Sequence, residues 1–292
     1  MIMNDQAANL RRHFDKTAKS NRTKTISIIS GKGGVGKSNI ALNFSLELIK
    51  NDKKVLLFDL DVGMGNIDIL LGLHAKRTII DMFQEQISIH DIIETGPNGL
   101  SYIAGGSGLN HFFTMNSREQ AYFFEQYYSL MKLYDYIIFD IGAGATADSL
   151  FFVLASNECI VVTTPEPTSI TDAYGMIKHV LHEQPDMPIR VIMNRSISQM
   201  DGTKSLERLQ QVVFRFLQIE IEMMGIIPDD ANVSHAVRRQ VPFVLLNDKT
   251  AVSKAMKQLT INYLSGANSG NKITPVSFVQ RLKQLLTARG NG

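Results

Sequence analysis

The sequence predicts an α/β fold with a mostly parallel central sheet of about seven strands and with helices on both faces. Short runs rich in Val, Ile, Leu and Phe alternate along the chain with longer amphipathic stretches. Repetition of strand and helix produces right-handed crossovers, which make neighbouring strands parallel. The runs are almost continuously apolar, as is typical of strands covered on both faces. A chain of 292 residues, 44% of them hydrophobic, is long enough to bury such a sheet.

The expected elements divide the chain into four segments. Strands are predicted at residues 25–30, 54–59, 100–104, 136–140, 159–163, 189–193 and 221–227. Helices are predicted at residues 37–50, 117–133, 146–155, 169–182, 205–217, 232–239 and 249–264. These elements form one domain from 25 to 264, preceded by a polar extension, 1–24. A segment rich in Gly, Ser and Asn at 265–275 is predicted to be a linker, and Pro275 can open a terminal helix within 276–289.

Composition indicates a reducing, aqueous compartment. The single cysteine, Cys159, excludes an internal disulfide framework, a four-cysteine zinc site and a paired-cysteine redox motif. No apolar run approaches the 18 residues of a membrane-spanning helix, and the polar N-terminus lacks the core of a signal peptide. We therefore expect a cytoplasmic protein.

The net charge of +2 is unevenly distributed. Residues 1–24 and residues 271–292 each carry a net charge of +4, so the body from 25 to 270 carries −6. Basic ends indicate that the ends meet anionic or acidic partners. The acidic body is a poor surface for nucleic acid, which we therefore do not expect as a partner.

A glycine-rich loop follows the first predicted strand and leads into an amphipathic helix. Its sequence, Gly31-Lys-Gly-Gly-Val-Gly-Lys-Ser38, has the spacing of a phosphate-binding loop, in which backbone N–H groups converge on phosphate oxygens. Lys37 is expected to reach the β- and γ-phosphates, and the Ser38 hydroxyl to bind Mg²⁺. The candidate nucleotide-binding residues here are Gly31, Lys32, Gly33, Gly34, Val35, Gly36, Lys37, Ser38 and Asn39. The loop predicts a P-loop NTPase-like fold that binds ATP or ADP with Mg²⁺.

Lys32 distinguishes this loop from the common form. With lysine at both positions, the loop resembles the deviant Walker A sequence of the MinD/ParA family of dimerising ATPases. In that family the extra lysine contacts the nucleotide of the other subunit, so the resemblance implies an ATP-dependent homodimer in which Lys32 and Lys37 are catalytic. A lysine cannot easily fold back onto phosphates that its own loop wraps, whereas a second subunit gives it a target. The alternative is a solvated lysine on an exposed loop.

Two predicted strands end in acidic residues. Asp59 and Asp61 have i, i+2 spacing, which puts both carboxylates on one side of an extended chain, at the edge of a parallel sheet where ligands bind. Asp140 ends another strand before a glycine-rich turn, which suits an acid near a metal and a loop that follows the γ-phosphate. The resemblance implies that Asp61 orients the attacking water. The candidate metal-binding residues are Ser38, Asp59 and Asp140. Family members often carry Thr where this chain has Ile141.

The strand at 189–193 runs into Asn194 and Arg195. An amide side chain offers a donor and an acceptor together, which suits the edge of adenine, and related ATPases use asparagine here. By the same resemblance, Pro228 and Asp229 after the last strand wall the base pocket, although a plain β-turn explains that pair nearly as well. The sequence lacks the Asn-Lys-x-Asp tetrad that reads guanine, which favours ATP over GTP.

The terminal helix is basic and amphipathic. Its apolar face comprises Phe278, Val279, Leu282, Leu285 and Leu286. Arg281 and Lys283 lie on its other sides, so the helix could lie in an anionic membrane interface. The alternative is a helix packed on the domain, and both could hold at different times. With the resemblance to MinD, we expect a cytoplasmic protein that binds the inner face of the cell membrane reversibly.

The N-terminal extension selects a branch of the family. Asp5-Gln-Ala-Ala-Asn-Leu-Arg11 resembles the N-terminal element of the FlhG (FleN, YlxH) group, the MinD-like ATPases that control flagellar number and placement. In that group the element stimulates FlhF, a signal-recognition-type GTPase, which implies Gln6 as a partner-binding residue. Flagellar switch (C-ring) proteins are further possible partners.

The sequence therefore predicts an ATP-hydrolysing switch that regulates flagella. Four alternatives stay open: a septum-site regulator of the MinD type, a DNA-partition ATPase of the ParA type, a metal-cluster carrier and a nucleotide-gated module that hardly hydrolyses ATP. The acidic body disfavours DNA, and the single Cys159 disfavours a metal cluster.

Overall fold

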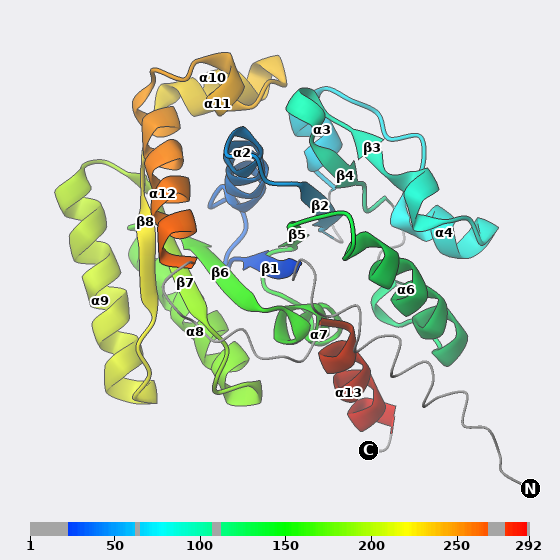
Figure 1. Ribbon diagram of the computed structural model, residues 1–292. Helices are drawn as coiled ribbons and strands as arrows, with labels where there is room; N and C mark the ends of the chain where they lie inside the picture. The colour runs from blue at the N-terminus through cyan, green and yellow to red at the C-terminus, as the bar shows by residue number, and fades with distance from the viewer. Residues whose placement is uncertain (1–22, 62–64, 107–111, 268–277, 291–292) are drawn as a thin grey trace, which may run out of the picture.

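The computed structural model describes residues 23–61, 65–106, 112–267 and 278–290. Its centre is a single eight-stranded sheet in the order β3-β4-β2-β5-β1-β6-β7-β8 (Figure 1). The strands are β1 (Lys24–Ile29), β2 (Val55–Leu60), β3 (Glu94–Thr95), β4 (Ser101–Ile103), β5 (Tyr136–Ile141), β6 (Glu158–Thr163), β7 (Ile189–Ser196) and β8 (Glu222–Pro228). All of them pair in parallel except β3, which is antiparallel to β4. The predicted fold class is confirmed, and β3 is the strand that the sequence did not predict.

Helices cover both faces of the sheet (Figure 1). They are α2 (Lys37–Lys50), α3 (Ile67–Leu71), α4 (Ile79–Glu85), α6 (Ser117–Leu130), α7 (Ala147–Ala155), α8 (Pro167–Glu183), α9 (Gln199–Leu217), α10 (Ala231–Arg239), α11 (Phe243–Leu246), α12 (Ala251–Ala267) and α13 (Phe278–Gly290), with 3₁₀ turns η1 (Ile89–Ile92) and η2 (Pro97–Gly99). One face packs against α2, α11 and α12, and the other packs against α6, α7, α8, α9 and α13. Each face has its own hydrophobic core.

Local sequence explains most of the helix boundaries. Helix α9 begins six residues before its predicted start, because the Ser198 side chain accepts a hydrogen bond from the Asp201 main chain and caps the helix. Helix α12 runs to Ala267, three residues into the predicted linker. The short helices α3, α4 and α11 were not predicted, since four to seven residues are too few to show a helical period.

The register between β2 and β5 positions the carboxylates. Both strands are buried along their whole length, and Asp59 lies directly opposite Asp140. Because the two strands are parallel, both side chains reach the carboxyl edge of the sheet together. Strand β1 lies on the other side of β5 and delivers the phosphate loop to the same edge.

Helix α13 packs on the domain through its apolar face. Phe278, Val279 and Leu282 are buried, with the Phe278 ring against Tyr127 of α6, Phe139 of β5 and Phe152 of α7. Leu285 and Leu286 are partly buried against the same core. The face predicted to meet a membrane is therefore covered in this state, as in the packed alternative. Within the described residues, no helix has both the length and the apolar character needed to cross a bilayer.

A buried polar network closes the amino edge of the sheet. Glu158 at the start of β6 pairs with Lys24 of β1 at 2.8 Å and with Arg190 of β7 at 3.3 Å, and it accepts a hydrogen bond from the Tyr263 hydroxyl of α12. Arg190 also pairs with Glu222 of β8. One carboxylate thus joins three elements to β6 at the edge opposite the predicted site.

We expect Glu158→Gln to lower the free energy of unfolding by about 3 kcal/mol, because it leaves the partly buried Lys24 without its counter-charge. Urea unfolding followed by circular dichroism measures the change. Glu220→Gln is the control, since Glu220 is exposed and a surface substitution stays within about 0.5 kcal/mol. Equal unfolding midpoints for the two variants would contradict the role of this network.

Candidate nucleotide-binding site

The phosphate loop joins β1 to α2 and rests on α8. A methyl group at Gly31 would lie 2.3 Å from the main-chain carbonyl of Asp172 on α8, so no larger residue fits there. Gly34 and Gly36 have φ values of 80° and 92°, a left-handed backbone that a side chain would strain. Helix α2 begins directly after Gly36, so the unpaired N–H groups of its first turn border the loop. This is the backbone geometry of an anion cradle.

Lys37 lies among carboxylates at the end of this loop. Its Nζ is 2.5 Å from Asp140 Oδ1, 3.8 Å from Asp61 Oδ2 and 3.4 Å from Ser38 Oγ. Lys37, Asp59 and Asp140 are all buried, and Asp61 is partly exposed. The structure therefore brings together five of the candidate catalytic and metal-binding residues. Together with Asp59, which lies opposite Asp140, the three carboxylates and one lysine give this end of the site a formal charge of −2.

Asp59 is held by the main chain that follows β2. Its carboxylate accepts hydrogen bonds from the main-chain N–H groups of Asp61, Asn66 and Ile67, at 3.2, 2.7 and 3.0 Å. Burial and the neighbouring Asp140 carboxylate raise the pKa of Asp59 to about 7, although the three N–H donors lower it. A cation nearby would favour the ionised form of Asp59.

These residues fit Mg²⁺ held together with a nucleotide. The Oδ2 atom of Asp140 is buried and has no hydrogen-bond partner among the described residues, although its Oδ1 pairs with Lys37. The formal charge of −2 matches one divalent cation. Within the described part of the chain, no cluster of three or more His, Cys, Asp or Glu residues could hold a metal alone. Phosphate oxygens and water would supply the remaining ligands, as is usual for Mg²⁺.

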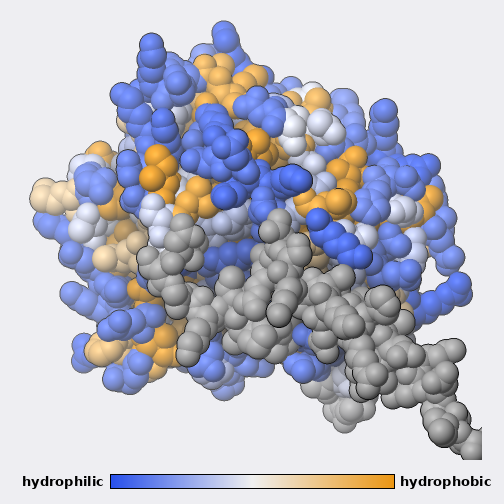
Figure 2. Space-filling model, viewed as in Figure 1, coloured by the Kyte–Doolittle hydropathy of each residue, from blue (hydrophilic) through white to orange (hydrophobic). Residues whose placement is uncertain are grey.

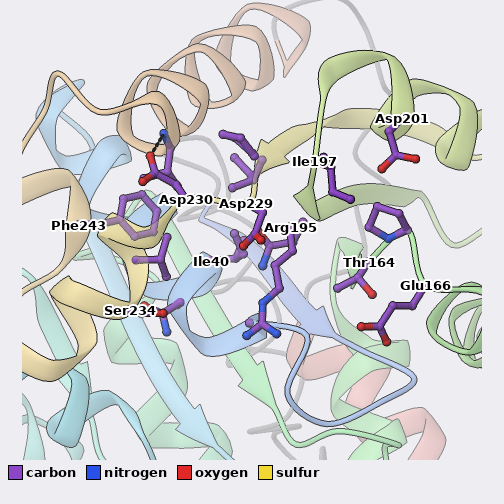
Figure 3. A pocket seen from close by; sticks show the side chains of 18 residues that line it. Ile40, Thr164, Glu166, Arg195, Ile197, Asp201, Asp229, Asp230, Ser234 and Phe243 are labelled. Carbon is purple, nitrogen blue, oxygen red and sulfur yellow. Dashed lines mark hydrogen bonds between the residues drawn. The ribbon is translucent and has the colours of Figure 1, made fainter.

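A cavity of about 680 Å³ opens beside the loop (Figure 3). This size is within the usual range for small-molecule sites. Its lining includes all four candidates for the adenine end: Asn194, Arg195, Pro228 and Asp229. Asn194 Nδ2 donates to the Val35 carbonyl at 2.8 Å, which ties β7 to the phosphate loop. Arg195 extends across the cavity from a backbone with φ of 55°, rare for a residue other than glycine, and Asp229 lies beside it.

The cavity also contains residues that the sequence did not indicate. Phe243 of α11 and Asp230 line one side, and Thr164 and Glu166 line the other (Figure 3). Asp230 caps α10 by accepting a hydrogen bond from the Asn232 main-chain N–H. Its position directly before a predicted helix is a sequence signal that could have identified it as the residue that caps this helix at the edge of the site. Phe243 offered no signal, because only tertiary folding brings it to the loop after β7.

Two further loops border the phosphate loop. The Gly144 N–H donates to the Ser30 carbonyl at 3.0 Å, which links the turn after β5 to the end of β1. A methyl group at Gly142 would lie 3.2 Å from the Asp61 carboxylate.

Ile141, where family members often have Thr, is fully buried in the core. This departure therefore removes no polar group from the solvent-facing part of the site.

Lys32 pairs with residues at the start of α8 in the single chain. Its Nζ is 3.3 Å from Glu166 Oε2 and 3.3 Å from Thr168 Oγ1 at the start of α8, and the side chain is 44% exposed. An exposed ion pair of this kind is worth at most about 1 kcal/mol, so Lys32 is free to change partner. Gln6 lies outside the described residues.

The carboxyl edge of the sheet thus combines an anion cradle, a cluster of carboxylates that could hold a metal ion with a nucleotide, and an adjoining cavity of nucleotide size. These are the features of a phosphate-loop nucleotide-binding protein. Residues 26–243 match the CobQ/CobB/MinD/ParA nucleotide binding domain (CbiA), and the chain belongs to that family. It is an ATPase.

Relatives and solved structures agree with this placement. The chain is 33% identical to the antiactivator FleN of Pseudomonas aeruginosa, over 74% of this chain and 78% of FleN. It is 31% identical to the flagellum site-determining protein YlxH of Helicobacter pylori, over 97% of this chain and all of YlxH. Its fold resembles the septum site-determining protein MinD of Pyrococcus horikoshii in complex with Mg-ADP, with a TM-score of 0.68 and 26% identity over 86% of this chain and all of that one.

Proposed function

We propose that the protein is an ATP-driven switch that regulates the number and placement of flagella. The match to YlxH along nearly the whole of both chains carries this proposal, together with the match to FleN. A septum-site role is the second candidate, because several MinD proteins are also 27–30% identical. Loss of the protein from its host separates the two: an altered flagellar count supports the first role, and misplaced septa with normal flagella support the second.

ATP-dependent dimerisation is the first part of the proposal. Among the described residues, the Lys32 ammonium group contacts only Glu166, in an exposed ion pair, and the Thr168 hydroxyl. If a second subunit presented the phosphates of its bound nucleotide at the same edge, Lys32 could form a stronger ion pair with them than with Glu166. The pairing with Glu166 would then be the resting state of the monomer.

We expect Lys32→Ala to bind ADP with nearly unchanged affinity and to stay monomeric with ATP, with slower hydrolysis. The reason is that the lysine acts on the nucleotide of the partner and not on its own. Gel filtration with ATP and with ADP measures the oligomeric state. Lys257→Ala, an exposed lysine on α12, is the control. Normal ATP-dependent dimers of Lys32→Ala would overturn the role in the partner subunit.

Hydrolysis is the second part. We propose that Mg²⁺ is held by Ser38 and by the carboxylates of Asp59 and Asp140, and that Lys37 binds the phosphates. When bound, Mg²⁺ would neutralise charge on the phosphates. Asp61 is the most accessible of the three carboxylates and lies 3.8 Å from Lys37 Nζ, so it is placed to orient the attacking water. Asn194 and Arg195 would hold the base, with Pro228 and Asp229.

We expect Asp61→Ala to bind ATP and dimerise but to lose at least 90% of its turnover, because phosphoryl transfer depends mainly on positioning. Asp59→Ala should instead weaken Mg²⁺-dependent binding of the nucleotide. Steady-state phosphate release and titration with a fluorescent ADP analogue separate the two effects. Unchanged phosphate release from Asp61→Ala would contradict the assignment.

Reversible membrane binding is the third part. Helix α13 packs against α7, which follows the glycine-rich turn after β5, and that turn is linked to the phosphate loop. One side chain of the docked helix, Arg281, is buried without its full set of hydrogen bonds: its Nε and Nη2 atoms have no acceptor among the described residues. Burial also lowers the pKa of Arg281. Undocking would let Arg281 reach water or an anionic head group. Two helices in one dimer would raise avidity by roughly 10²–10⁴.

We expect the wild-type protein to float with anionic vesicles in ATP and much less in ADP. Phe278→Glu and Leu286→Glu should both abolish flotation, since a charge on the apolar face opposes insertion. Leu286 is only partly buried, so its variant leaves the docked core intact. Gln284→Glu, on an exposed side of the same helix, is the charge-matched control. Equal flotation under all conditions would rule out a nucleotide-gated anchor.

Stimulation of an FlhF-like GTPase at the same membrane is the fourth part of the proposal, and the N-terminal extension would perform it. Flagellar switch proteins would be further partners of the dimer. We expect a peptide of residues 1–24 to accelerate GTP hydrolysis by such a GTPase, and the Gln6→Ala peptide to do so at least about tenfold less. No stimulation by the wild-type peptide would discard this partner and leave the ATPase unaffected.

A further inference from the structure

A second cavity lies at the amino edge of the sheet, the edge opposite the nucleotide site. Its volume is about 370 Å³, which is near the lower end of the range for small-molecule sites. Its apolar lining comes from the end of α2, the start of β2 and the turn after α6, and consists of Ile49, Val55, Leu133 and Tyr134. Leu133 is 48% exposed, although it is apolar. We call this cavity the amino-edge pocket.

The amino-edge pocket is also basic. Lys53 and Lys54 belong to its lining, and the exposed Lys132 directly precedes Leu133. Within the described part of the chain, no carboxylate forms an ion pair with the ammonium group of Lys53 or Lys54. A segment that fits this pocket therefore combines large apolar side chains with a neighbouring carboxylate.

The N-terminal extension joins the domain beside this pocket. The Thr23 hydroxyl oxygen lies 2.7 Å from the carbonyl oxygen of Tyr134, and the Lys24 N–H donates to the Asp135 carbonyl at 2.8 Å. The Asp135 carboxylate in turn accepts a hydrogen bond from the Lys54 N–H at 2.9 Å. The extension thus begins at residues that line the pocket or directly adjoin its lining.

The sequence of the extension, which lies outside the described residues, has the complementary side chains. Gln6, Leu10 and Phe14 follow one another at intervals of four, so a helix would place all three on one face. The only acidic residues of the extension, Asp5 and Asp15, stand next to Gln6 and Phe14 in the sequence. This face therefore offers two large apolar groups with carboxylates beside them.

We propose that the amino-edge pocket binds the N-terminal extension of its own chain, with Leu10 and Phe14 against the apolar lining and Asp15 near the lysines. Eight residues separate Phe14 from Thr23, and they can span at most about 30 Å, which is enough to reach a pocket that begins at Tyr134. A tethered segment has an effective concentration in the millimolar range, so even a weak contact is occupied.

The size of the pocket favours a short tethered segment over a folded partner. A standard protein–protein interface buries about 800 Å² on each partner, whereas four side chains make up the apolar lining here. Figure 2 likewise shows apolar side chains in small groups among hydrophilic ones on the face that it presents. A segment of the same chain avoids most of the entropic cost of association, so a small contact area is sufficient.

Docking would conceal the residue that the proposed function assigns to partner binding. Because Gln6 shares a face with Leu10 and Phe14, a docked extension does not present this face to a GTPase. This consequence rests on the proposed stimulation of an FlhF-like GTPase, whereas the docking itself does not. The pocket and the phosphate loop lie at opposite edges of the sheet, so docking requires no nucleotide.

The test uses the fluorescence of the full chain. The protein has no tryptophan, so a Phe14→Trp variant reports on the surroundings of residue 14 alone. In this background we expect Leu133→Glu to shift the emission to longer wavelength and to raise acrylamide quenching at least about twofold, because it removes an apolar contact and gives the lysines a carboxylate of the domain itself. Leu10→Glu should have the same effect without altering the folded domain. Ile261→Glu, at an apolar residue of α12 that is 37% exposed, is the control.

Three outcomes would overturn the docking: unchanged quenching in both Leu133→Glu and Leu10→Glu, an equal increase in Ile261→Glu, or protection that appears only as the protein concentration rises, which would assign the pocket to the extension of a second copy. ATP hydrolysis of each variant should equal that of the wild type, because none of the substituted residues lines the nucleotide site.

The concealment has its own readout. Leu133→Glu in the otherwise native chain should stimulate an FlhF-like GTPase at least about twofold more than the wild type, because more of the extension is free. Equal stimulation by the two proteins would overturn the concealment. No stimulation by either protein, with the fluorescence result intact, would refute the GTPase partner of the proposed function and not the docking.

Discussion

The burial of Lys37 between carboxylates is the interaction on which the rest of the site depends. Asp59 and Asp140 are forced together by the parallel register of β2 and β5, and neither can move without displacing a core strand. Burial and the neighbouring Asp140 carboxylate raise the pKa of Asp59 to about 7, and three main-chain N–H groups oppose this shift. Lys37 pairs with Asp140. Negative charge gathered in a buried place suits a cation held together with a polyphosphate, as in the proposed binding of Mg²⁺ and nucleotide.

Neighbouring elements extend this site toward the rest of the molecule. The turn after β5 is tied to the phosphate loop through Gly144 and Ser30, and α7 follows that turn. Helix α7 in turn carries Phe152, against which Phe278 of α13 packs. The nucleotide end and the C-terminal helix therefore share one continuous packed path.

The sequence predicted the regular part of the fold well, because each strand is a buried apolar run and each long helix has a clear period. Strand β5 was expected at 136–140 and ends at Ile141, and α2 was expected and found at Lys37–Lys50. It missed the two-residue strand β3 and the short helices α3, α4 and α11, which tertiary packing stabilises. The phosphate loop and its carboxylates were identifiable because their chemistry depends on spacing along one or two strands.

The sequence by itself determined the fold class, the phosphate loop and the residues that meet at the carboxyl edge. The alternation of strands and helices gives the fold class, and the spacing of residues at the ends of parallel strands gives the loop and the site residues. Only the tertiary structure decided which distant segments complete them. It placed Phe243 and Gly36 against the same cavity, and it covered the apolar face of α13 with Phe139 and Phe152. Amphipathic periodicity tells which face of a helix is apolar and not what covers it, because core, membrane and partner all satisfy the same hydrophobic requirement.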